Sequence, residues 1–334
     1  MVVGTGSIGN RHLRNLLELG HRDLIAVSEF SKRASLEIDG LSIPVHHNLK
    51  SLLEHNKSIK SVFLCNPSSM HYSYLLLCVY HGKHVYLEKP VASSISEITE
   101  VESLIRSNPV TIAVGNQFRF DPQLIEIKKK IAHNAIGEIH STHAIQGEHI
   151  EDYHPGENFR LGYASRKELG GGVLLTQIHQ IDYLNWLLGP FKSVFATYSK
   201  PHLLNLDVEE NVSYLLCGPK GETVYGHVDY LRRPKTASLV LSGTLGTIEW
   251  SYYDRSLKVI GVEPDSSPSV SNINEDRNVL FQRAIKNFFD SIDGKSFPRS
   301  TLVDGINALA IVEAIKKSAV DQCTSKIKTI DELS

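Results

Sequence analysis

The sequence predicts an α/β protein in which a doubly wound, parallel sheet is followed by a second, largely antiparallel sheet. In the first third of the chain, short β-branched runs alternate with amphipathic segments, which is typical of parallel strands joined by crossover helices. After about Arg119 the pattern changes to alternating strands separated by turn residues, which indicates antiparallel pairing. We therefore expect two domains, residues 1–118 and residues 119–334.

The first domain is expected to alternate strands with helices. Its expected strands are Met1–Val3, Leu24–Ser28, Ser61–Cys65, His84–Leu87 and Thr111–Val114. Its expected helices are Asn10–Leu19, Met70–His81 and Ser96–Ser107. The first strand has only three residues before Gly4, which favours a native start several residues upstream of Met1.

The second domain is expected to combine strands with three long helices. Its clearest strands are Val212–Leu216, Val224–Leu231, Ser238–Leu241 and Thr247–Trp250. The helices are expected at Gly172–Leu188, Asn278–Ile292 and Val303–Ser318. The segment Glu263–Asn274 is polar enough to predict a mobile loop.

Composition excludes several classes of protein. A chain of 334 residues that is 41% hydrophobic and 22% charged is typical of a soluble globular protein with two cores. It has 35 basic and 37 acidic residues and no basic block with interleaved aromatic residues, so we expect no nucleic-acid partner. The longest apolar run, Tyr74–Tyr80, has seven residues, and no charged leader precedes the first strand, so we expect a cytoplasmic protein without membrane association. The cysteines lack metal-type spacing and predict free thiols in a reducing compartment: Cys65, Cys78, Cys217 and Cys323.

A glycine-rich turn joins the first expected strand to the first expected helix. The segment VVGTGSIG contains the pattern G-x-G-x-x-G, which lets bare backbone and a helix N-terminus approach a pyrophosphate. This context predicts a Rossmann dinucleotide-binding domain. The residues expected to contact the cofactor here are Gly4, Gly6, Ser7, Ile8 and Gly9.

An acidic residue follows the second expected strand at the distance that such domains use. Glu29 lies twenty residues after Gly9, where a carboxylate can bind the ribose 2′- and 3′-hydroxyls. A carboxylate at this point would repel a 2′-phosphate, so NAD is the expected cofactor. Lys32 and Arg33 could moderate that repulsion but are more often solvated loop charges, so NADP is the second choice.

Polar residues follow the other strands of the expected parallel sheet. Ligands of such sheets bind beyond the carboxyl ends of the strands, so these residues are expected at the cleft that the glycine turn borders. The expected cofactor contacts among them are Asn66, Pro67, His71, Glu88, Lys89 and Gln117. Lys89 stands out because Pro90 follows it, which restricts the lysine stem. The alternative for Lys89 is an ordinary surface lysine at a strand end.

The segment GGGVLLTQIHQIDYLNWLLG, residues 170–189, places one histidine in an apolar, helix-like run. A helix that is apolar on most sides is buried on most sides. His179 is therefore either a core histidine that a backbone partner satisfies or a group held at a site.

Six motifs together resemble the family of glucose-fructose oxidoreductase and inositol 2-dehydrogenase, known as Gfo/Idh/MocA. They are GTGSIG at 4–9, CNPSSMH at 65–71, GKHVYLEKPVA at 82–92, GNQFRFDP at 115–122, IGEI at 136–139 and GGGVLLTQIHQID at 170–182. The resemblance implies an N-terminal Rossmann domain and a C-terminal α/β domain with a mixed, mostly antiparallel open sheet. It also implies a sugar or cyclic polyol substrate between the domains, oxidised or reduced at one carbinol carbon with NAD(H) or NADP(H). Members commonly assemble through the open sheet face, so a homodimer or homotetramer is expected.

The resemblance also implies roles for individual residues. Lys89 corresponds to the family's catalytic lysine, with Glu88 and Pro90 shaping the loop and a Lys89–Pro90 bond that can be cis. His179 corresponds to the histidine that takes the hydroxyl proton, which suits an imidazole with an ordinary pKa of roughly 6.5. Lys89 can stabilise the alkoxide or act as the base if desolvation lowers its pKa.

The chain departs from the family pattern before the histidine. Many members have D-x-x-x-H, whereas here Thr176 lies three residues before His179 and no aspartate lies one turn before it. On one helix, a threonine at i−3 would share nearly the same face but could not support an imidazolium with negative charge. This departure shifts weight toward Lys89 as the base. Asp182 could pair with His179, although a structural role for Asp182 is favoured.

Further polar residues are candidates for substrate or metal contacts. The expected substrate contacts are Lys89, Tyr163, Thr176 and His179, with Arg166 and Lys167 as weaker basic neighbours. Two strands carry side chains of metal-binding type, but their spacing is that of strand alternation, so no metal is expected: His143, Glu148, His149, His227 and Asp229.

Three functions remain. The favoured one is an NAD(P)-dependent dehydrogenase or reductase for a CH–OH group of a sugar or sugar derivative, nucleotide-linked or acidic sugars included. The second is a redox-neutral sugar lyase or hydrolase that uses held NAD transiently. The third is a non-catalytic, NAD-dependent sensor or regulator, which the intact Lys89 and His179 oppose. Net release of NADH would separate the first from the other two.

Overall fold

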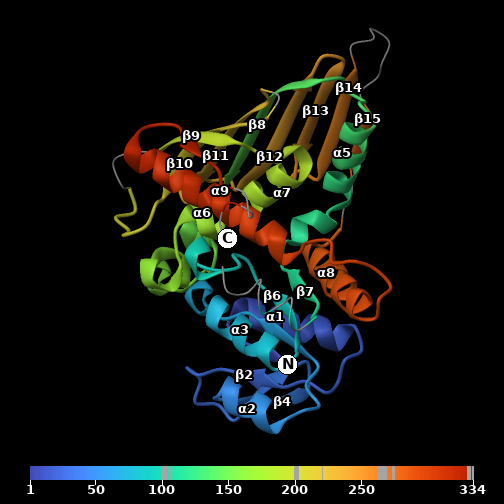
Figure 1. Ribbon diagram of the computed structural model, residues 1–334, viewed down its shortest axis with the longest axis vertical. Helices are drawn as coiled ribbons and strands as arrows, with labels where there is room; N and C mark the ends of the chain where they lie inside the picture. Colours follow the sequence, from blue (N-terminus) through green and yellow to red (C-terminus); the bar gives the residue numbers. More distant parts are fainter. Residues whose placement is uncertain are drawn as a thin grey trace. The chain divides into compact units, whose positions relative to one another are not determined.

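The computed structural model describes residues 1–98, 104, 107, 109–198, 203–219, 221–261, 269–272, 275–328 and 332. The chain forms two compact units (Figure 1). The first unit consists of Met1–Gln117 and Asp276–Ile306, and the second of Phe118–Glu275 and Asn307–Ser334. The sequence-based division placed all residues after 118 in the second domain, whereas the segment Asp276–Ile306 belongs to the first compact unit.

The described strands of the first unit form a sheet in the order β3-β4-β2-β1-β5-β6-β7. All neighbours pair in parallel except the hairpin of β3 and β4, and Val2 of β1 pairs with both Ala26 and Phe63. The five predicted strands are confirmed, but the hairpin was not predicted. The strands are β1 (Val2–Val3), β2 (Ala26–Val27), β3 (Ser35–Ile38), β4 (Leu41–His46), β5 (Ser61–Leu64), β6 (His84–Leu87) and β7 (Ile112–Val114).

The helices of the first unit connect these strands. They are α1 (Ser7–Glu18), α2 (Leu49–His55), α3 (His71–Tyr80) and α8 (Arg277–Ile292), with short 3₁₀ turns at Ser68–Met70 and Ile95–Glu97. The predicted helix Ser96–Ser107 lies mostly outside the described residues. Helix α8 belongs to this unit because the ring of its residue Phe288 packs on Phe63 and Tyr86, with centroids 5.6 and 5.7 Å apart. Apolar periodicity predicts the helix itself, but it does not indicate with which of the two units the helix packs.

The described strands of the second unit form a mixed, mostly antiparallel sheet in the order β15-β14-β13-β12-β8-β11-β10-β9-β16. Only the pairing of β8 with β11 is parallel among these described strands. Side chains alternate in burial along β10, where Val212, Tyr214 and Leu216 face the core. The strands are β8 (Ile139–Gly147), β9 (Ser193–Tyr198), β10 (Asn211–Cys217), β11 (Thr223–Asp229), β12 (Thr236–Gly243), β13 (Gly246–Ser251), β14 (Ser256–Gly261), β15 (Ser269–Asn272) and β16 (Ser325–Lys326).

Two predictions for the second unit are wrong. The mobile loop expected at Glu263–Asn274 contains strand β15, which pairs with β14; the other residues of that segment lie outside the described residues. The long helix expected at Gly172–Leu188 is two helices, α6 (Val173–Thr176) and α7 (His179–Leu188). Apolar periodicity continues across the break because both helices are buried, so the sequence pattern does not reveal it.

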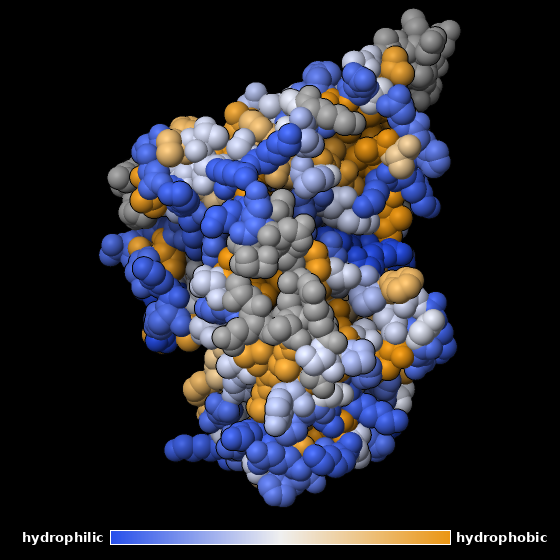
Figure 2. All heavy atoms as spheres, viewed as in Figure 1, coloured by the Kyte–Doolittle hydropathy of each residue, from blue (hydrophilic) through white to orange (hydrophobic). Residues whose placement is uncertain are grey.

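The remaining helices of the second unit are α5 (Pro122–Ala132) and α9 (Leu302–Asp321), whose first turn belongs to the first unit. Asp121 caps α5 by accepting hydrogen bonds from the backbone of Gln123 and Leu124, and Pro122 occupies the first helical position. None of the described helices combines the length and apolar composition needed to cross a bilayer. Figure 2 shows hydrophilic and apolar residues interspersed on the visible face.

Candidate functional site

The glycines of the turn between β1 and α1 serve two purposes: some permit the tight backbone path, and one leaves space beside the helix. Gly4 has a φ of 96°, and a Cβ at Gly9 would overlap the carbonyl oxygen of Gly4, so both positions serve the tight passage from β1 into α1. Gly6 is exposed, and a Cβ built there meets no described atom within 4 Å. Gly6 directly precedes α1, whose first N–H groups have no acceptor within the helix, so the space at Gly6 fits an approaching phosphate.

Strand ends bring the other predicted cofactor residues of the first unit to one edge of its sheet. Strands β1, β5, β6 and β7 are parallel neighbours, so the residues that follow them lie at the same edge. Both side-chain polar atoms of Asn66 are buried and have no hydrogen-bond partner among the described residues. A buried amide without partners is costly, so a polar ligand group at this point would satisfy it. Asn66 and the glycine turn therefore fit a dinucleotide.

Lys89 follows β6 and is half-buried. Desolvation lowers its pKa to about 8; the charge of Glu88 opposes this effect, and that of Arg277 adds to it. At neutral pH the ammonium form of Lys89 therefore still predominates, but the side chain loses its proton at only slightly higher pH. The Lys89–Pro90 peptide bond is cis, as the sequence analysis allowed.

Glu88 is buried against His12, a histidine that was not among the predicted site residues. Its Oε1 atom lies 2.7 Å from Nε2 of His12, and the two side chains are 8% and 0% exposed. The imidazole is surrounded by the rings of Phe63, Tyr86 and Phe281. His12 lies four residues before Leu16 on the buried face of α1, and this helical spacing is the signal that could have indicated the pair. Glu88 thus acts on Lys89 through its charge, and its contact with the cofactor stays a prediction.

His71 links two of the expected cofactor loops. Its Nδ1 atom lies 2.6 Å from the carbonyl oxygen of Pro90, and its Nε2 atom lies 2.9 Å from that of Asn66. Burial lowers the pKa of His71, which favours the neutral ring that donates to one of these two acceptors. His71 therefore connects the loops that contain Asn66 and Pro90. Its direct contact with a cofactor stays a prediction.

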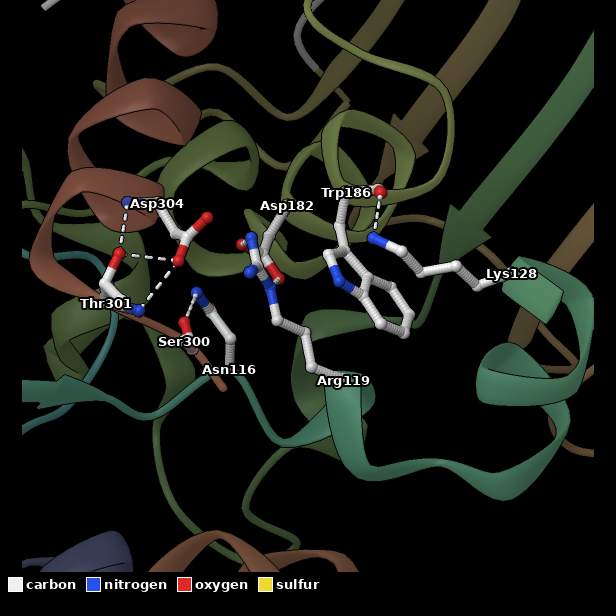
Figure 3. Close-up of polar contacts among 8 residues, drawn as sticks. All are labelled: Asn116, Arg119, Lys128, Asp182, Trp186, Ser300, Thr301 and Asp304. Carbon is white, nitrogen blue, oxygen red and sulfur yellow. Dashed lines mark hydrogen bonds and ion pairs between the residues drawn. The ribbon is translucent and has the colours of Figure 1, made fainter. Parts of the chain in front are cut away.

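Glu29 lies beyond β2 and is exposed. The Tyr74 hydroxyl of α3 hydrogen-bonds its carboxylate, and burial together with this acceptor raises the Tyr74 pKa. Tyr74 thereby holds the exposed Glu29 carboxylate in place as a hydrogen-bond acceptor, which is the role that binding of the ribose hydroxyls requires. Gln117, at the other end of the sheet edge, is buried next to Asn116, whose side chain donates to Ser300 Oγ at 3.0 Å (Figure 3).

His179 is the first residue of α7 in the second unit and is 7% exposed. Its ring meets that of Phe118 edge-on, with centroids 5.4 Å apart. Thr176 ends the separate helix α6, so the same-helix relation expected for the two residues is wrong. The Thr176 hydroxyl lies 2.6 Å from the hydroxyl of Tyr230, so it is held within the unit's own core, and its substrate contact stays a prediction.

Asp182, one turn after His179, is bound by an arginine. Arg119 donates from Nε to Asp182 Oδ2 at 3.0 Å and from Nη2 to Oδ1 at 2.8 Å (Figure 3). The two side chains are 3% and 1% exposed. A pair of Asp182 with His179 was the less favoured expectation, and the structure gives the carboxylate to Arg119 instead. The only signal in the sequence was an arginine between two phenylalanines in FRF.

The other candidates of the second unit lie on its loops. Tyr163 begins a 3₁₀ turn and is 37% exposed, whereas Arg166 pairs with Glu168. Gly172, with a φ of 110°, lies against the carboxylate of Glu209, whose Oε1 accepts a hydrogen bond from the Leu174 N–H at the start of α6. The triple glycine therefore shapes the entry into α6, and the substrate contact of Tyr163 stays a prediction.

The strand residues with side chains of metal-binding type form local pairs. His227 lies opposite Ser213 in the sheet and contacts its hydroxyl at 2.9 Å, while Asp229 is shared between His227 and Arg232. His143 stacks on Tyr225, and His149 lies 3.6 Å from Glu151. Within the described ranges, three or more His, Cys, Asp or Glu side chains nowhere gather closely enough to hold a metal ion.

Comparison with known proteins places these features in a family. The model of the oxidoreductase family with an NAD-binding Rossmann fold, GFO_IDH_MocA, matches residues 1–116, and the model of the GFO/IDH/MocA C-terminal domain matches residues 124–249. The chain belongs to the Gfo/Idh/MocA oxidoreductase family. The predicted family membership, fold class and NAD-binding Rossmann domain are thereby confirmed.

Individual relatives are distant. The chain is 28% identical to the uncharacterized oxidoreductase YrbE of Bacillus subtilis over 60% of its own length and 55% of YrbE, so it spans about half of that relative. It is 22% identical to myo-inositol 2-dehydrogenase of Thermotoga maritima over 98% of both chains. The solved structure of levoglucosan dehydrogenase in complex with NADH is 18% identical and has a TM-score of 0.86, with 98% of both chains covered. This last likeness shows the fold of the family.

Proposed function

We propose that this protein catalyses NAD-dependent hydride transfer at a CH–OH carbon of a sugar or cyclic polyol. The observation that supports this most directly is Lys89, whose pKa is lowered to about 8 at the sheet edge that the glycine turn also borders. Membership in an oxidoreductase family with an NAD-binding Rossmann fold supports it, as do relatives named for a polyol and an anhydrosugar.

Residues of the first unit are proposed to bind NAD. The N–H groups at the start of α1 would hold the pyrophosphate, with Gly6 leaving room for it. Glu29 would accept the ribose hydroxyls and disfavour a 2′-phosphate. Asn66 would offer its buried amide to the cofactor. The bound cofactor supplies the hydride acceptor or donor, which no protein side chain can provide.

Two side chains are proposed to handle the proton and the reacting oxygen. In the direction of oxidation, the hydroxyl proton passes to the imidazole of His179, which takes up and releases protons near neutral pH. The ammonium group of Lys89 donates a hydrogen bond to the same oxygen and stabilises the negative charge that develops there. A second assignment, with neutral Lys89 as the base, is also compatible with its pKa of about 8 and predicts the opposite pH dependence.

The test is net NADH formation by the purified full-length protein with NAD and a panel of cyclic polyols, anhydrosugars and free sugars. We expect one class to support turnover, and we expect Lys89→Met and His179→Gln to abolish most of it. Lys60→Met, at an exposed lysine of the same unit, is the matched control and should leave turnover unchanged. Absence of net NADH formation across the panel contradicts a dehydrogenase and favours redox-neutral use of NAD or ligand sensing.

A further inference from the structure

Arg119 lies in the second unit between two aromatic residues of the 3₁₀ turn Gln117–Phe120. Its guanidinium binds both carboxylate oxygens of Asp182, and both side chains are almost fully buried. The guanidinium also lies 5.8 Å from the ring centroid of Trp186, one turn further along α7 (Figure 3). Arg119 therefore contacts the same helix at two successive turns.

Its neighbour Phe118 contacts that helix one turn earlier. The Phe118 ring meets the imidazole of His179, and His179 and Asp182 are three residues apart on α7. Residues three apart in a helix are neighbours on its surface. Two consecutive residues, Phe118 and Arg119, thus hold two neighbouring side chains of α7, of which His179 is the proposed proton acceptor.

The charge of Asp182 matters because it is buried. A carboxylate one turn from an imidazole stabilises the imidazolium, and in a desolvated setting this attraction is strong. Arg119 cancels that charge. Charged groups of other elements of the second unit at this face include Lys128 of α5, whose Nζ donates to the Trp186 carbonyl oxygen at 2.9 Å, and Arg255, whose guanidinium lies 4.5 Å from the centroid of the Tyr252 ring that packs on Phe118. Tyr183 and Tyr214 stay neutral because burial raises their pKa, and the Thr176 hydroxyl carries no charge.

We infer that Arg119 is a positioning residue for His179. By holding Asp182 in a neutral, bidentate pair, it fixes the first turn of α7 and keeps the imidazole in the unprotonated form that can accept a proton. This inference rests on the proposed function of His179 as the proton acceptor. The pair is specific to arginine geometry, because a lysine cannot make two parallel bonds to a carboxylate.

The test measures the pH at which His179 is half-protonated in the full-length protein without substrate or NAD. Histidines labelled with ¹³C are titrated by NMR, and the His179 signal is assigned by its loss in His179→Gln. We expect Arg119→Gln, which leaves a buried carboxylate unpaired, to raise the midpoint, and Asp182→Asn, which leaves a buried guanidinium, to lower it. The double variant Arg119→Gln/Asp182→Asn should return the midpoint close to that of the parent.

Opposite shifts are the signature that a merely structural pair would not produce. Lys128→Gln is the matched control, because it removes a cation at the far end of α7, and it should move the midpoint less than Asp182→Asn. If one single variant does not fold, as judged by circular dichroism, the other and the uncharged double variant still decide the comparison. Shifts in the same direction, or no shift in folded variants, overturn the inference.

This readout is independent of turnover. If His179→Gln turned over at the parental rate while the midpoints moved in opposite directions, the proposed proton transfer would fail and the charge compensation by Arg119 would stand. If the midpoints did not move but His179→Gln were inactive, the inference about Arg119 would fail and the proposed function would stand. In the parent background, Arg119→Lys should recover part of the turnover lost in Arg119→Gln.

Discussion

The two units treat a buried carboxylate beside an expected functional residue in different ways. In the first unit, Glu88 precedes Lys89 and its carboxylate contacts the imidazole of His12. In the second unit, Asp182 follows His179 by one turn and its carboxylate binds the guanidinium of Arg119. Each carboxylate is almost fully buried, and each partner comes from a different element of the same unit.

The difference lies in the chemistry of the partner. His12 contacts Glu88 through one ring nitrogen, and the charge of Glu88 opposes the fall in the pKa of Lys89. An arginine is always charged, so it compensates Asp182 at every working pH. The comparison teaches that the carboxylate beside Lys89 acts on the pKa of that lysine, whereas the carboxylate beside His179 is bound by a permanent cation.

The largest expected effect is on turnover. His179→Gln and Lys89→Met should each lower kcat by about 10²- to 10⁴-fold, the usual contribution of a general acid or base, with the affinity for NAD largely kept. Steady-state kinetics together with NAD titration by fluorescence measures both quantities. Parental kcat in either variant would show that only one of the two units supplies a catalytic residue.

Breaking the ion pair of the second unit should cost the most folding stability. Arg119→Leu leaves the Asp182 carboxylate buried without its cation and should lower the free energy of unfolding by about 3–5 kcal/mol. His12→Leu should cost only about 1–3 kcal/mol, because it removes one hydrogen-bond partner of Glu88 and not a permanent cation. Urea unfolding at neutral pH measures both values. Equal costs would contradict the proposed difference between the two pairs.

The glycine turn allows stability to be separated from binding within the first unit. Gly9→Ala forces a Cβ against the Gly4 carbonyl oxygen and should destabilise the protein by about 2–4 kcal/mol. Gly6→Ala meets no described neighbour and should leave the melting temperature nearly unchanged while weakening NAD binding. Thermal unfolding with and without NAD tests the pair. A parental affinity for NAD in Gly6→Ala would argue against a phosphate at this point.

The smallest expected effect is a shift of the pH profile. Lys89 is protonated below its pKa of about 8, so if its ammonium form stabilises the reacting oxygen, kcat should fall as the pH rises through about 8. If neutral Lys89 is the base, kcat should instead rise through the same pH. Glu88→Gln removes the charge that raises this pKa, so the limb should move to lower pH. If the change of kcat near pH 8 stayed at the same pH in Glu88→Gln, it would belong to a group other than Lys89.

Local features of this protein were predictable from its sequence because they depend on residues close together in the chain. The turn from Gly4 to Gly9 is visible because glycine alone permits it, and the strand ends at Asn66 and Lys89 follow from short apolar runs with polar residues behind them. The same local logic failed at Gln177–Ile178, where two buried helices meet without a change of periodicity. It also failed at β15, whose polar residues become a strand only by pairing with β14.

The sequence by itself determined the glycine turn, the acid at Glu29, the lysine before a proline and the order of the two folds. Only the tertiary structure decided the partners of the buried carboxylates: His12 lies 76 residues from Glu88, and Arg119 lies 63 residues from Asp182. It also decided that α8 packs with the first unit. The physical reason is that such pairs follow from the packing of elements far apart in the chain, whereas turns and strand ends follow from local backbone preferences.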